Sequence, residues 1–168
     1  MTKLFNVFHG CRLTKQNRIP GNIPLLTAGE QNQGVAGYIG NAEMACYKDP
    51  ITVDMFGNCF FHSGLFTGDD NIYFFVNDSI SDDTKLYIAA VIEKQTKEQY
   101  SYAKQFRQPM ADSLTVPLPV TSSGDLDYDY MEHYIRAIEK LTIANVVKYK
   151  NRVIAETKKI VDGSEASS

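Results

Sequence analysis

Short apolar segments bounded by glycine, proline or asparagine fill most of the first 120 residues. This pattern is typical of β-strands, and it predicts strands at residues 4–8, 23–26, 35–39 and 71–76. Residues 51–55, where apolar positions alternate, and residues 59–61 predict a hairpin, because Gly57 and Asn58 supply the turn between them. Residues 86–92 predict a short buried helix, whereas Pro117 and Pro119 make residues 114–119 an extended segment. We therefore expect an α+β fold, with a mixed α/β domain of short strands and hairpins at residues 1–121.

The pattern changes after the turn at residues 122–124. Asp125, Asp127 and Asp129 suit a helix N-terminus, and the next glycine or proline is Gly163. Apolar residues between them recur at intervals of three and four, as in an amphipathic helix. The sequence thus predicts a helix at residues 125–162, about 57 Å long, followed by a disordered tail at residues 163–168.

Such a helix would extend beyond its own domain, because a domain of this size is roughly 35 Å across. Its distal half would expose an apolar stripe, which costs about 25 cal/mol per Å². Antiparallel coiled-coil pairing with a second copy would cover the stripe. The residues expected at that dimer contact are Ile138, Leu141, Val146, Val153, Ile154 and Ile160. The alternative is a break near Asn145 that folds the helix back.

Composition fits one sizeable core, since 43% of the 168 residues are hydrophobic. The net charge of −3 argues against a generally basic nucleic-acid binder, but the charges are segregated. Residues 1–29 hold four cations and no acid, residues 49–83 hold seven aspartates and no cation, and residues 94–108 are basic again. One face could therefore be positive, although ordinary solvated faces would also explain this pattern.

Three cysteines without a CxxC pair favour a reducing cytoplasm over a disulfide scaffold. No apolar run approaches the roughly 20 residues of a membrane span. We expect a cytoplasmic protein with no membrane partner.

Most catalytic signatures are missing, including the glycine-rich nucleotide loops, HExxH, GxSxG and the Asn/Asp-Pro-Pro-aromatic motif of amino-methyltransferases. Cys59 and His62 could be half of a metal site, but no second pair has ligand spacing, and we expect no metal. Asp83, Thr84 and Lys85 match the Asp-x-Lys form of metal-dependent nucleases, with Asp69 or Asp70 as a conceivable partner. A helix start capped by Asp82 or Asp83 explains the same residues.

Two segments are suited to contact with nucleic acid. Residues 12–41 are rich in glycine and contain three consecutive amides, Gln31, Asn32 and Gln33, whose paired donor and acceptor match the major-groove edge of adenine. Residues 100–107 combine cations with tyrosines and Gln105. The alternative for this second segment is a surface turn whose aromatic residues pack inward.

Seven segments in order carry a family resemblance: RLTK, PLLTAGEQNQGVAGYI, ITVDMFGN, DDNIYFF, YSYAKQFR, VPLP and GDLDYDYMEHYI. They resemble the target-recognition domain of Type I restriction-modification specificity subunits and the related domains of Type IIB and IIG systems. The resemblance implies a non-catalytic protein without a cofactor. Such a protein reads part of a double-stranded DNA site and directs an adenine methyltransferase subunit, and a restriction subunit, to it.

Specificity subunits of this family carry two recognition domains and two spacer helices, whereas this chain has one of each. It resembles a half-subunit, which implies a homodimer on a bipartite site. The alternative is that the chain is a fragment or a decayed remnant of a longer subunit. Phosphate contacts are expected from Arg12, Lys15, Arg18, Lys104 and Arg107. Base reading is expected from Gln31, Asn32, Gln33 and Gln105, and Thr14 and Tyr102 complete the DNA-contacting set.

Two other functions stay open at this stage. The first is a helix-mediated interaction or decoy protein, which binds the methyltransferase without reading DNA. The second is a small metal-dependent nuclease that uses Asp83.

Overall fold

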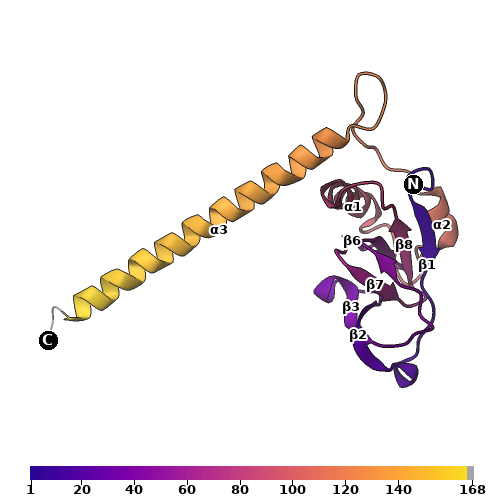
Figure 1. The fold of residues 1–168 in the computed structure, drawn as a ribbon, viewed down its shortest axis with the longest axis horizontal. Helices are drawn as coiled ribbons and strands as arrows, with labels where there is room; N and C mark the ends of the chain where they lie inside the picture. The colour runs from indigo at the N-terminus through magenta and orange to yellow at the C-terminus, as the bar shows by residue number, and fades with distance from the viewer. Residues whose placement is uncertain (166–168) are drawn as a thin grey trace. The chain divides into compact units, whose positions relative to one another are not determined.

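The computed structural model describes the backbone of residues 1–165 and the side chains of residues 1–157. The chain divides into two compact units, at residues 1–132 and 133–168 (Figure 1). The first unit contains eight described strands in two sheets, together with helices α1 (Asp82–Thr96) and α2 (Gln108–Ser113). Helix α3 (Tyr128–Glu165) begins in the first unit and makes up the described part of the second.

The first sheet is antiparallel, in the order β1-β8-β5-β6. Its strands are β1 (Asn6–His9), β8 (Ile72–Val76), β5 (Ile51–Asp54) and β6 (Cys59–Phe61). The second sheet has the order β3-β2-β7-β4, in which β2 and β7 are parallel. Its strands are β3 (Val35–Ile39), β2 (Pro20–Leu26), β7 (Leu65–Gly68) and β4 (Tyr47–Lys48).

The core lies on both faces of the central strands β5 and β8. Ile51, Val53, Tyr73 and Phe75 belong to one buried cluster with Ile88 and Ile92 of α1. Phe74, on the opposite face, packs with Leu26 of the second sheet. Because both faces are covered, all four residues of β5 are buried.

Most predicted elements are present. Strand β3 has the predicted bounds, and β5 and β6 form the predicted hairpin. The sequence reading did not identify β4, β7 or α2. Strand β4 has two residues and β7 is defined by pairing with distant strands, whereas α2 has proline in its first turn, where the missing N–H is tolerated.

Helix α3 begins three residues later than predicted. Val120 and Leu126 form a bridge, and Gly124 turns the chain between them with a φ of 88°. The Asp127 carboxylate then accepts a hydrogen bond from the Tyr130 N–H at 2.9 Å, as an N-cap does. The 38-residue helix passes Asn145 without a break, which excludes the fold-back alternative.

The helix ends at Glu165 rather than residue 162, so residues 163–165 are helical and not part of a tail. Residues 166–168 of the predicted tail, and the side chain of Ile160, lie outside the described residues. Within the second unit, the other expected dimer residues are exposed, from 39% for Val153 to 62% for Leu141. None of the described helices combines the length and hydropathy needed to cross a bilayer.

Cys59 and His62 face opposite sides of the first sheet. Cys59 belongs to the cluster around α1, and burial raises the pKa of its thiol well above the usual range, so the thiolate that binds metals is disfavoured. The His62 ring contacts the Thr52 hydroxyl at 2.9 Å and packs on Phe66. The two side chains therefore cannot share a metal. No group of three or more metal-ligating residues is found in the part of the chain that the structure describes.

Buried His62 should make the protein less stable in mild acid. Burial lowers its pKa from 6.5 to about 4, so the unfolded chain binds a proton in this range that the folded protein does not. The free energy of unfolding should therefore fall by about 3 kcal/mol as pH drops from 6.5 to 4. Urea denaturation at several pH values measures this loss. The variant His62→Gln should lose that part of the pH dependence, whereas His9→Gln should keep it; equal slopes for all three proteins would contradict the assignment.

Candidate nucleic-acid interface

Three strand ends meet at one end of the first sheet. His9 at the end of β1 pairs with Tyr73, and Asp54 at the end of β5 pairs with Ile72. The segment after β1, the segment before β8 and the turn after β5 therefore start from the same place. The segment after β1 carries four of the residues that the sequence predicts for DNA binding, Arg12, Thr14, Lys15 and Arg18.

The basic residues after β1 gather around one pocket of about 290 Å³. Arg12, Thr14, Lys15 and Arg18 line it, together with residues 69–71 from the loop before β8. Leu13 anchors this segment, because its side chain is buried with Leu25 and Ile39 of the second sheet. These four residues are close in sequence, and in the structure they line the same pocket.

The pocket contains both signs of charge. Arg12 forms an ion pair with Asp70 at 3.4 Å, and its side chain is 76% exposed, so water weakens the pair. Burial raises the pKa of the neighbouring Asp69 carboxyl. The Nε of Arg18 is buried and has no hydrogen-bond partner among the described residues. A buried donor of this kind is unfavourable until an acceptor reaches it.

Asn41 holds the basic segment in place. Its Oδ1 accepts the Ile19 N–H at 2.9 Å, and its Nδ2 donates to the Asn17 carbonyl at 3.0 Å and to Glu43 at 2.8 Å. Only 8% of Asn41 is exposed. Its buried side chain therefore fixes the chain on both sides of Arg18 to the end of β3. The sequence reading did not single out this residue, because an isolated asparagine after a strand usually forms a turn.

The three predicted amides form an exposed turn, Gln31–Gly34, between β2 and β3. Asn32 and Gln33 both adopt left-handed backbone conformations, with φ of 48° and 52°. Two consecutive left-handed residues other than glycine cost roughly 1–2 kcal/mol each. The turn is closed by a hydrogen bond from the Thr27 N–H to the Gly34 carbonyl at 2.9 Å. Strain of this kind at an exposed polar turn is a feature of ligand-contacting sites.

Residues 100–107 divide into an inward and an outward set. Phe106 is fully buried and Tyr100 packs against it. These two rings therefore agree with the alternative prediction of a surface turn whose aromatic residues pack inward. Tyr102 is 81% exposed, and Lys104 lies 5.7 Å from the centre of the Tyr100 ring. Arg107 is exposed and donates a hydrogen bond to the half-buried Gln105. The predicted contact residues of this segment thus lie at the surface, apart from Gln105.

The Asp-x-Lys motif marks the start of a helix. The N-cap is Ser81, not Asp82 or Asp83, and its hydroxyl accepts the Thr84 N–H at 3.2 Å. Lys85 is buried, with its Nζ 3.9 Å from Asp82. The predicted nuclease partners Asp69 and Asp70 line the basic pocket instead. Helix capping therefore accounts for these residues.

The chain thus consists of a domain of two small sheets, which presents basic and amide-rich loops, and a long amphipathic helix. The chain belongs to the family of Type I restriction modification DNA specificity domains, whose model matches residues 2–149. It is 26% identical over 153 residues to the specificity subunit S.BcgI of a Type II restriction enzyme from Heyndrickxia coagulans. That match covers 88% of this chain and 45% of the relative, so the chain spans about half the relative's length.

A Type I restriction-modification S subunit from M. genitalium is similar in structure. The TM-score is 0.49 with 19% sequence identity, covering 89% of this chain and 39% of the other.

Replacing Asn41 should destabilise the domain by a measurable amount. Asn41→Ala removes the hydrogen bonds to the Ile19 N–H and the Asn17 carbonyl, and each lost bond costs about 1 kcal/mol. Thermal or urea denaturation should detect the loss. Asn6→Ala, at an exposed position of β1, serves as the control and should change stability little. Equal stability of the Asn41→Ala variant and the unaltered protein would contradict this role.

Proposed function

We propose that this chain is a DNA specificity half-subunit of a restriction-modification system. The observation that carries the proposal is the family match over residues 2–149. The convergence of Arg12, Lys15 and Arg18 on one pocket supports it. In this role the chain does no chemistry; it places a partner adenine methyltransferase, and a restriction subunit, on a chosen DNA site.

The contacts divide by chemistry. Arg18 lines the pocket, where its guanidinium can bind a phosphate oxygen. Arg12 can exchange Asp70 for phosphate, because an exposed pair is weak. Lys104 and Arg107 bind phosphate from the second segment, and Tyr102 offers a ring and a hydroxyl beside them. Gln31, Asn32 and Gln33 read base edges from the amide turn, and Thr14 and Gln105 complete the DNA-contacting set.

Two copies pair through helix α3 in this proposal. The exposed apolar side chains of the second unit, including Ile138, Leu141 and Val146, supply the contact. A two-fold dimer would read two half-sites of a bipartite, palindromic sequence.

DNA binding should weaken steeply with salt. If five cations contact phosphates in each of two protomers, the slope of log affinity against log salt approaches about −9. Arg18→Ala should weaken binding to all sequences and make the slope shallower by about 2 for a dimer. Electrophoretic mobility shift with random-sequence duplexes measures both. Lys48→Ala, at an exposed cation of β4, is the control and should behave like the unaltered protein.

A lack of DNA binding at low salt, both alone and with the methyltransferase, would rule out the reader function. It would leave the interaction or decoy function, in which helix α3 alone contacts the partner.

The dimer can be tested separately. Light scattering should give about twice the chain mass of 18.9 kDa, and removal of residues 146–168 should give the monomer mass. Leu141→Glu should also favour the monomer, because it buries a charge in the pairing stripe. Lys140→Glu changes the charge beside the stripe and should leave the dimer intact. A monomer at micromolar concentration for the unaltered chain would contradict the symmetric site.

A further inference from the structure

A buried carboxylate connects the end of β5 to the amide turn. Only 4% of Asp54 is exposed, and its Oδ1 accepts the N–H groups of Phe56 and Asn58 at 2.8 and 2.9 Å. Its Oδ2 accepts the Asn58 side-chain amide at 2.8 Å and the Gly29 N–H at 2.8 Å. The first three bonds are local and shape the turn at residues 54–58. The fourth reaches across 25 residues to the amide segment.

The amide turn depends on support from outside itself. Asn32 and Gln33 are in a costly left-handed conformation, which persists only where the surroundings fix it. Gly29 lies two residues before Gln31, and its φ of 146° is one that residues with a side chain rarely adopt. The bond to Asp54 therefore holds Gly29, which precedes the strained turn and, as a glycine, could otherwise adopt many backbone conformations.

The turn at residues 54–58 also contacts residues 100–107, the second segment that the sequence predicts to bind DNA. The Met55 carbonyl accepts the Phe106 N–H at 2.8 Å, and the Gly57 carbonyl accepts the Thr96 hydroxyl at 2.6 Å. Gly57 is close-packed here, because a Cβ at this position would lie 2.7 Å from the Thr96 carbonyl oxygen. Residues 54–58 thus touch both segments that the proposed function places on DNA.

We propose that Asp54 is a positioning residue for DNA specificity. It contacts no DNA; it fixes the amide turn relative to residues 100–107, so that Gln31, Asn32 and Gln33 meet the base edges in one register. This inference rests on the proposed function, and it adds a residue that sets sequence discrimination from inside the domain.

Asp54→Asn removes the bond to Gly29 and keeps the two local bonds to backbone N–H groups. The asparagine keeps one carbonyl oxygen, which can still accept the local N–H groups of Phe56 and Asn58. Its amide group would face the Gly29 N–H and the Asn58 side-chain amide, and two donors cannot bond to each other. The Asn58 amide can rotate to present its oxygen, whereas the Gly29 backbone N–H has no such alternative. The local turn should therefore persist while the amide turn loses its anchor.

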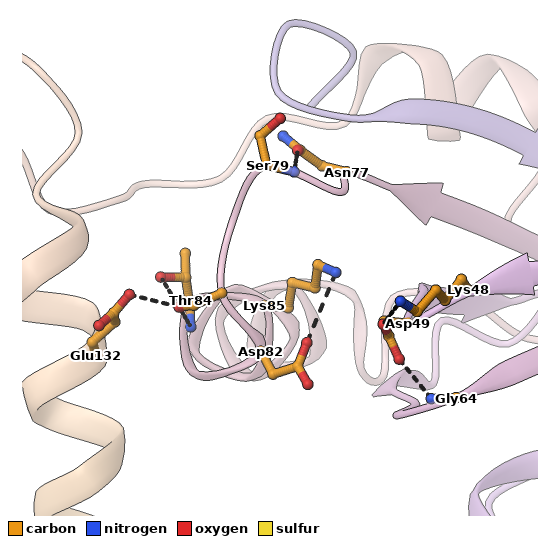
Figure 2. A network of polar contacts seen from close by, with 10 residues as sticks. Lys48, Asp49, Gly64, Asn77, Ser79, Asp82, Thr84, Lys85 and Glu132 are labelled. Atoms are coloured by element: carbon orange, nitrogen blue, oxygen red, sulfur yellow. Dashed lines mark hydrogen bonds and ion pairs between the residues drawn. The ribbon is translucent and has the colours of Figure 1, made fainter.

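Asp49→Asn is the matched control. Asp49 accepts the Gly64 N–H at 2.6 Å, a bond of the same type at a different loop (Figure 2). Both substitutions remove one negative charge from the domain. A general electrostatic gain in DNA affinity should therefore appear in both variants, whereas a change in discrimination should appear only in Asp54→Asn.

The first measurement uses the full chain without DNA. Amide hydrogen exchange at residues 27–34 should be about tenfold faster in Asp54→Asn, as expected for loss of one hydrogen bond, and unchanged in Asp49→Asn. The second measurement is selection from random-sequence duplexes with the full chain, together with the methyltransferase if binding requires it. The ratio of affinities for the best site and for single mismatches should fall about tenfold in Asp54→Asn alone, while affinity for random DNA at low salt is retained.

If Asp54→Asn does not fold, Gly29→Ala provides the same test from the other side of the bond. Nothing lies within 4 Å of a Cβ built on Gly29, so the substitution strains only the backbone and should displace the Gly29 N–H. Unchanged exchange, or faster exchange with undiminished discrimination, would overturn the role of Asp54 while the DNA-reading function stood. Absence of DNA binding by the unaltered protein would instead overturn the proposed function, and the specificity role with it.

Discussion

Burial of β5 and β8 on both faces is the constraint on which the rest of the first unit depends. Ile51, Val53 and Phe75 pack toward α1, whereas Phe74 packs toward the second sheet. Because these strands are antiparallel and in fixed register, the end of β5 lies beside the start of β8. The loops after β5 and before β8 are therefore attached to well-packed strands. Loops on a rigid scaffold are where binding residues are usually placed.

Polar side chains, rather than apolar ones, attach those loops to the base. Asn41 fixes the basic segment, and Asp54 fixes the amide turn, each through hydrogen bonds between groups distant in sequence. A loop with few large apolar residues cannot be held by a core, and buried amide or carboxylate groups with full hydrogen bonding can replace it. The recognition surface can then stay polar without being loose.

Charge is arranged by folding as well as by sequence order. The aspartates of residues 49–83 have different environments in the folded chain. Asp54 is buried, Asp82 lies at the start of α1, and Asp70 pairs with Arg12. A chain with a net charge of −3 can thus present basic groups locally. Acidic groups inside the basic pocket also reduce its net positive charge.

The sequence alone determined the class of fold, the β5–β6 hairpin, the buried helix, the long amphipathic helix and the family, because these follow from local periodicity and from ordered motifs. It also identified Arg12, Lys15 and Arg18 as candidates. Only the tertiary structure decided that they share a pocket with Asp69 and Asp70, that Ser81 caps α1, and that β4 and β7 exist. It alone revealed the anchoring by Asn41 and Asp54. These features depend on contacts between residues far apart along the chain, and local patterns carry no information about such contacts.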